Sequence, residues 1–255
     1  VSLIFFLFGS SLWKKVIGGS CVLIASICLL ISQTRGSWVG FGLSIIFLLS
    51  LLKLKDRNVF RGARKTVQII FILGAFILLG FGVLDLQTHG LSEVKAVVSR
   101  TGSIFTFGDE FRRFVWHATV IMIKEHPFMG VGLGGFKQQY PEYQAKLLGR
   151  EEYPSYVQGS NVPQAHNEFL QVWAEMGISG IIIVVWLVSA FFYHGITTLK
   201  RLKTPYMWKL AAGMLAGCFA VLVHAIASFP FHLASTASVF VPLCSLIAVM
   251  GPIQS

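Results

Sequence analysis

Long apolar runs separated by short polar segments dominate the sequence. A helix that crosses a membrane needs roughly 20 predominantly apolar residues. Six runs come near this length, at residues 16–32, 38–52, 66–84, 178–196, 207–229 and 233–250. Residues 1–12 are apolar as well and predict the end of a further, partial span. The pattern predicts an all-α polytopic membrane protein, a helical bundle with six full spans and a partial first span.

The basic residues orient these spans. Residues 53–65 carry Lys53, Lys55, Arg57, Arg61, Arg64 and Lys65 against a single acid, Asp56, which predicts a cytoplasmic loop. Lys14 and Lys15, and the basic cluster at 200–203, agree with this orientation. We therefore expect one integral membrane unit in three parts, with spans at 1–84 and 166–255 and a long external, periplasmic loop at 85–165.

The external loop contains an amphipathic pattern at residues 111–126. Phe114, Ala118, Ile121 and Met122 share one helical face, whereas Arg113, Lys124 and Glu125 lie off it. We expect this helix to lie on the membrane surface. It ends at Pro127, and a glycine-rich run follows at residues 130–135. Because no convincing strand precedes the run, a dinucleotide-binding fingerprint is a poor interpretation.

Composition and charge agree with the membrane interpretation. Hydrophobic residues make up 55% of the chain, charged residues 13%, and the mean hydropathy is +0.70. The net charge of +10 would suggest nucleic acid for a soluble protein, but the basic residues lie in short loops between apolar runs. Nucleic acid is therefore excluded as a partner, and membrane lipids are expected. Since the sequence starts inside an apolar run without methionine, we expect a segment to precede it.

Candidate chemistry gathers on the predicted outer side. The planar guanidinium of Arg35, in a turn between two spans, suits a phosphate, and the alternative is a side chain that binds bulk lipid headgroups. Arg112 and Arg113 open the amphipathic helix, where a bound anion would offset their repulsion by the helix dipole. A solvated face is the alternative for this pair. His232 lies in a short outer turn at 230–232.

His166 is the candidate proton acceptor. Asn161 and Gln164 fit a capping box, so a helix is expected to start there, with His166 within its first two turns. A positive dipole end favours neutral imidazole, although a plain surface histidine is the alternative. Glu168 and Glu175 are seven residues apart and share a face, where they either pair with the arginines or solvate the helix. The histidines, cysteines and acids show no zinc spacing, so no metal is expected.

Three strings resemble one family, the O-antigen ligase and polymerase superfamily. Residues 165–171 (AHNEFLQ) and 175–180 (EMGISG) resemble its signature most strongly. Residues 32–36 (SQTRG) look like its Ser/Thr-Arg-Gly turn. Residues 113–116 (RFVW) and 126–134 (HPFMGVGLG) look like its Arg-x-x-Trp helix and the following glycine motif. The strings occur in the order of the family.

The resemblance implies an activity and a site. Members transfer glycans from undecaprenyl diphosphate to an acceptor at the periplasmic face of the inner membrane of Gram-negative bacteria, without a cofactor. By this resemblance Arg35 and Arg113 hold the diphosphate, and His166 is the base. Arg112 is a further candidate for the diphosphate, and its sharing of the role of Arg113 is open because neighbouring residues point different ways on a helix. Asn167, Glu168 and Glu175 are expected to support it. Members are usually longer, with about a dozen spans.

The acceptor is open at this stage. A ligase uses lipid A core, a polymerase uses a growing lipid-linked glycan, and related enzymes use protein side chains. Residues 165–171 resemble ligase-type members best. A transporter of lipid-linked glycans is the non-enzymatic alternative, but it should carry polar residues at mid-membrane, and His224 is the main ionisable residue within the predicted spans.

Overall fold

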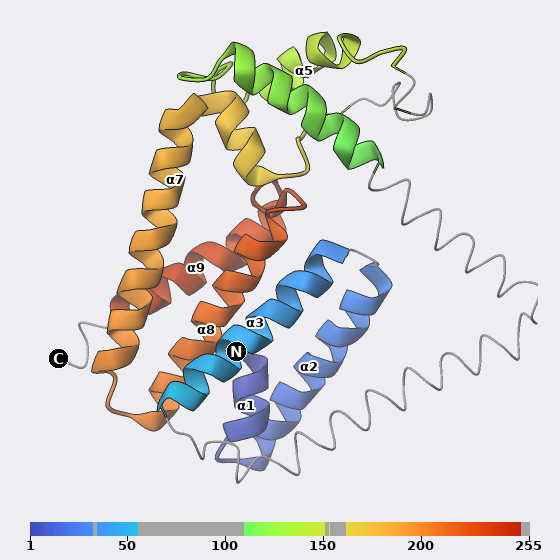
Figure 1. Cartoon of the computed structure of the whole chain (residues 1–255). Helices are drawn as coiled ribbons and strands as arrows, with labels where there is room; N and C mark the ends of the chain where they lie inside the picture. Colours follow the sequence, from blue (N-terminus) through green and yellow to red (C-terminus); the bar gives the residue numbers. More distant parts are fainter. Residues whose placement is uncertain (33–34, 56–109, 151–152, 154–161, 251–255) are drawn as a thin grey trace, which may run out of the picture.

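The computed structural model describes residues 1–32, 35–55, 110–150, 153 and 162–250. Regular structure in these ranges is entirely helical (Figure 1), which confirms the all-α prediction. The elements are α1 (Ser2–Phe8), α2 (Leu12–Ser32), α3 (Arg35–Lys55), α5 (Phe136–Ala145), α7 (Glu168–Arg201), α8 (Pro205–His224), the 3-10 turn η1 (Pro230–His232) and α9 (Ala234–Met250). A further helix occupies residues 110–125.

Four of the described helices are long and apolar enough to cross a membrane, namely α2, α3, α7 and α8. Helix α9 is apolar but shorter, at 17 residues. The predicted run at 66–84 lies outside the described residues, so the count of six spans stays a prediction. The partial span expected at 1–12 contains only the seven-residue α1, whose Ile4 is buried against Gly213 of α8.

Small residues bring α3 and α8 into close contact. A β-carbon on Gly40 of α3 would lie 2.8 Å from the carbonyl oxygen of Ala220, and one on Gly36 would lie 3.0 Å from Nδ1 of His224. Small side chains of this kind let helix backbones approach within a membrane. The packing places the start of α3 beside the end of α8. The residue at that start is Arg35.

Helix α7 is bent sharply at Gly177. This residue has φ 64° and ψ −161°, which separates a short segment at 168–176 from a long one at 178–201 (Figure 1). The glycine-rich loop packs into the bend, where the Pro127 carbonyl accepts from the N–H of Ile178 at 2.9 Å. A β-carbon on Gly177 would overlap the Phe128 carbonyl, and one on Gly130 would overlap the Glu175 carbonyl. Both positions therefore require glycine.

The bend gives a test of the packing. Gly177→Ala combines a left-handed backbone, which costs about 1–2 kcal/mol for a residue with a β-carbon, with a backbone overlap that the loop must move to relieve. We expect a clear loss of thermal stability in detergent. Gly42→Ala in α3 is the control, because its β-carbon meets nothing within 4 Å. Equal melting temperatures for the two variants would contradict the described bend.

The helix at 110–125 confirms the predicted apolar face but not its partner. Phe114, Ala118 and Met122 are fully buried, and Arg113, Lys124 and Glu125 are exposed. The buried face packs on protein rather than lipid, in a cluster that includes Phe136, Tyr140, Tyr143, Leu147, Val162, Ala165 and Ala174. The interpretation that this face rests on the membrane surface is therefore corrected. Aromatic side chains of α5 and of the following segment supply the apolar surroundings.

Candidate functional site

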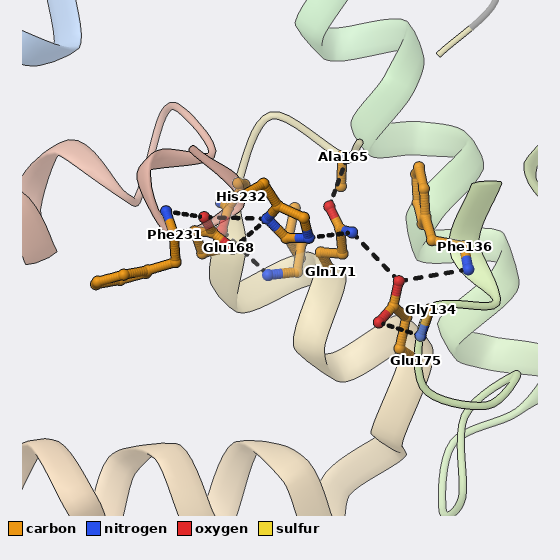
Figure 2. A network of polar contacts seen from close by, with 10 residues as sticks. Gly134, Phe136, Ala165, Glu168, Gln171, Glu175, Phe231 and His232 are labelled. Carbon is orange, nitrogen blue, oxygen red and sulfur yellow. Dashed lines mark hydrogen bonds and ion pairs between the residues drawn. The ribbon is translucent and has the colours of Figure 1, made fainter. Parts of the chain in front are cut away.

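A group of polar side chains meets where the short segment of α7, the turn at 162–167, η1 and the glycine-rich loop come together (Figure 2). Glu168 and Glu175 are its buried carboxylates, with exposed fractions of 6% and 7%. A buried carboxylate is costly unless it accepts hydrogen bonds. The partners of these two acids therefore define the architecture of the site.

Glu168 ties α7 to the short turn η1 between α8 and α9. Its Oε1 accepts from the Phe231 N–H at 2.8 Å, and its Oε2 lies 3.1 Å from Nδ1 of His232. Its own N–H donates to the carbonyl of Ala225, just after α8. The contacts of one residue thus join α7, the end of α8 and η1.

Glu175 ties α7 to α5. Its carboxylate accepts from the N–H groups of Gly134, at 2.9 Å, and Phe136, at 3.4 Å, at the start of α5. Gln171 donates to the same carboxylate from Nε2 at 3.2 Å. In the described part of the chain, both acids are therefore satisfied by backbone groups, Gln171 and His232. The burial of both side chains corrects the alternative of solvation, whereas pairing with Arg35, whose side chain lies outside the described part, stays a prediction.

The role of Glu175 can be checked by substitution. Glu175→Ala removes the acceptor of the Gly134 and Phe136 N–H groups. Phe136 is buried, and an unsatisfied buried group costs about 1–3 kcal/mol. We expect lower thermal stability and faster proteolysis within residues 136–145. Glu142→Ala is the control, since the side chain of Glu142 is 65% exposed. A Glu175→Ala variant as stable as the control would show that the carboxylate does not hold α5.

His166 precedes α7 rather than lying within a helix. Helix α7 begins at Glu168, and its cap is Asn167, whose Oδ1 accepts from the N–H of Leu170 at 3.0 Å. The predicted helix start near Asn161 is wrong for the described residues from 162 onward, which are not helical there; Asn161 itself lies outside the described residues. The supporting role expected for Asn167 is thus structurally defined as a helix cap.

The surroundings of His166 favour its neutral form. The backbone is left-handed, with φ 53°, and the ring lies edge-on to Phe111 and Phe229, with centroids 5.4 and 4.9 Å away. Partial burial, and secondly the positive charge of Arg112, hold the pKa of His166 below its usual 6.5. An imidazole that is neutral near pH 7 is able to accept a proton. Burial and the charge of Arg112 lower this pKa, and the helix whose dipole was expected to contribute begins at Glu168.

The structure separates the two neighbouring arginines. Arg112 is partly buried and close enough to His166 to affect its pKa, whereas Arg113 is exposed. Arg35 is the first residue of α3, and its side chain lies outside the described part. Its backbone neighbour Gly36 lies against His224, one residue before the Ala225 carbonyl that Glu168 binds. Arg35 is therefore brought to the end of the bundle where the site lies.

Two members of the polar group had no predicted role. Gln171 lies three residues after Glu168 and four before Glu175, a spacing that places all three on one helical face. His232 was placed on the outer side without a partner. Two further side chains lie nearby: the Trp116 indole donates to the Ala165 carbonyl, and His224 lies beside Gly36 and the Ser37 hydroxyl at the start of α3. Among the described residues, no group of three or more histidine, cysteine or acidic side chains is arranged to hold a metal ion.

Comparison with known proteins agrees with this arrangement. The sequence profile described as O-antigen ligase matches residues 20–185, which is more than half of the chain and includes the site strings. An uncharacterized protein of Haemophilus influenzae is 21% identical over 191 residues, covering 73% of this chain. The chain spans 45% of the length of that relative. With its apolar spanning helices, the chain is a multi-pass bacterial membrane protein that belongs to the O-antigen ligase family.

Proposed function

We propose that this protein is a glycosyltransferase that moves an oligosaccharide or polysaccharide from undecaprenyl diphosphate to an acceptor such as lipid A core. The reaction takes place at the periplasmic face of the bacterial inner membrane. The observation that carries the proposal is the environment of His166. This histidine is half-buried near Arg112, and its pKa is lowered. It lies at the end of the bundle where α3 begins with Arg35. Family membership supplies the substrate class.

His166 acts as the general base. Its neutral ring takes the proton from the acceptor hydroxyl, and the oxygen forms a bond to the anomeric carbon of the donor glycan. The bond between that carbon and the diphosphate oxygen breaks, and the oxygen keeps the electron pair. Undecaprenyl diphosphate departs as the leaving group. Attack opposite the leaving group inverts the configuration of the sugar.

The arginines stabilise the departing diphosphate. A guanidinium is always charged and donates bidentately, so Arg35, Arg113 and Arg112 are suited to the charge that develops on the leaving group. The position of Arg112 beside His166 favours a place for it at the reacting end of the diphosphate. The exposed Arg113 is then available to the outer part of the same group. Neither role requires a metal or a cofactor.

The acceptor is tested in membranes. We express the complete gene in a bacterial strain that lacks its own O-antigen ligase and analyse the glycan attached to lipid A core. A restored glycan ladder supports the ligase activity, which the resemblance of residues 165–171 favours. Long lipid-linked chains without attachment would replace the ligase with a polymerase, and glycan on protein would indicate a protein O-glycan ligase. Movement of intact donor across the membrane would indicate a transporter.

The pH dependence of the rate tests the base. The neutral form of His166 is lost as the pH falls through its pKa, so the rate has an acid limb below pH 6.5, the usual pKa of histidine. Arg112→Gln removes a charge that lowers this pKa. The pKa rises, and the acid limb of kcat/KM moves to higher pH. Arg113→Gln is the matched control, because it removes an exposed charge. If the acid limb of Arg112→Gln lies at the same pH as that of the wild type, the Arg112 charge does not lower the pKa of the base.

A further inference from the structure

Both backbone polar groups of Ala165, the residue before His166, are hydrogen-bonded to side chains. The N–H of Ala165 donates to Oε1 of Gln171 at 3.0 Å, and its carbonyl accepts from the Trp116 indole at 3.0 Å. Ala165 is fully buried. The next residue, His166, has φ 53°, and a left-handed backbone costs a residue with a β-carbon about 1–2 kcal/mol. Fixed contacts on Ala165 are what keep the chain in this turn.

The direction of the Gln171 amide follows from its partners. Since Oε1 accepts from the Ala165 N–H, Nε2 faces Oε1 of Glu175, at 3.2 Å, and Nε2 of His232, at 3.1 Å (Figure 2). A reversed amide would turn its NH2 group toward another N–H and its oxygen toward a carboxylate. Two hydrogen bonds would be lost for a buried side chain. The observed orientation is therefore the one in which the Gln171 amide makes all of its hydrogen bonds.

The same contacts assign the proton on His232. Because Gln171 Nε2 is a donor, the facing Nε2 of His232 must accept. A neutral ring that accepts at Nε2 carries its proton on Nδ1, and this proton points to Glu168, 3.1 Å away. Glu168 is itself held by the Phe231 N–H. His232 is thus anchored on one side and orients Gln171 on the other.

We propose that Gln171 and His232 are positioning residues for His166. His232, neutral and protonated at Nδ1, fixes the amide of Gln171, whose oxygen holds the Ala165 N–H and so the left-handed turn that presents His166. The effect on rate rests on the glycosyltransferase function proposed above, whereas the hydrogen-bond pattern does not. Neither residue touches the reacting atoms in this scheme.

Hydrogen exchange tests the link between Gln171 and Ala165. The complete protein is placed in lipid nanodiscs, and exchange is resolved at the Ala165 amide by mass spectrometry. Gln171→Met keeps the length of the side chain but has no acceptor, so the amide should exchange at least about tenfold faster as the turn opens locally. Gln139→Met, on the exposed face of α5, should leave this rate unchanged. Unchanged exchange in Gln171→Met overturns the proposal.

The proton on His232 is read in the wild-type protein, and a variant is used only to assign the signal. Nitrogen-15 NMR of labelled histidines distinguishes a protonated from an unprotonated ring nitrogen, and His232→Gln identifies the signal. We expect Nδ1 protonated and Nε2 unprotonated at neutral pH. A proton on Nε2 overturns the assignment and with it the orientation of Gln171.

The rate measurement separates this proposal from the function on which it rests. A misplaced base lowers the rate of the chemical step by up to about 100-fold. Gln171→Met should therefore lower kcat, while KM for the lipid-linked donor stays the same. Wild-type kcat in a folded Gln171→Met variant overturns the positioning role. If the wild type transfers no glycan at all, the proposed function fails, and exchange and NMR still decide whether Gln171 and His232 hold the turn.

Discussion

Replacing His166 with asparagine is expected to lower the transfer rate by about 10²–10⁴-fold, the usual contribution of a general base. Asparagine tolerates the left-handed backbone at this position better than most residues, so the turn should survive. The variant therefore removes the proton acceptor and leaves the fold. The rate is measured as glycan joined to lipid A core per unit time, at equal protein levels in the membrane.

The matched control for this change is His126→Asn. His126 is exposed and lies just after the helix at 110–125, between α3 and α7 along the chain. Its loss should leave the rate near that of the wild type. If His166→Asn retains the wild-type rate, His166 is not the base, and the site must be sought elsewhere in the chain.

Replacing Arg35 with alanine is expected to lower the rate by about 10²–10³-fold, as when one donor to a developing negative charge is removed. Arg35 opens α3, and the contact of Gly36 with His224 brings this helix end to the site. In the proposed mechanism, a guanidinium there stabilises the departing diphosphate more than the bound donor. The loss should therefore lie mainly in kcat.

A lysine at position 35 separates charge from geometry. Arg35→Lys keeps one positive charge but not the two parallel donors that suit a diphosphate, so it should recover only part of the rate. Lys137→Ala is the control for loss of a positive charge, because Lys137 is an exposed residue of α5. Full activity in Arg35→Ala would place the diphosphate away from the start of α3.

Apolar periodicity predicted the helices because hydrophobic length and spacing are local properties of the sequence. The runs at 16–32, 38–52, 178–196, 207–229 and 233–250 each fall largely within a described helix. The face of the helix at 110–125 was also visible from the spacing of Phe114, Ala118 and Met122. Periodicity did not reveal what covers that face, since lipid and a protein interior are both apolar.

The start of α7 shows why caps are harder to predict. Asn161 and Asn167 are both good capping residues, and Gln164 made the first of them look better. Tertiary contacts decide between them. The N–H and carbonyl of Ala165 are used by Gln171 and Trp116, so they are not available to a helix that starts earlier. Sequence spacing alone gives no sign of such distant partners.

Chemistry and resemblance identified the candidate residues in the sequence, but not the separate role of each residue. The sequence left open whether Arg112 shares the role of Arg113, and the structure places Arg112 near His166 and leaves Arg113 exposed. Glu168 and Glu175 were predicted to share a face. The residue that joins them, Gln171, becomes meaningful only with His232, which is distant in sequence.

The most direct test uses the complete protein, purified in nanodiscs, with undecaprenyl-diphosphate-linked glycan as donor and lipid A core as acceptor. Mass spectrometry measures the glycan joined to the acceptor and the undecaprenyl diphosphate released. The account predicts that the two products form in equal amounts with the wild type and that both are nearly absent with His166→Asn. Equal product from the two proteins, or no cleavage of the donor with any acceptor, would contradict it.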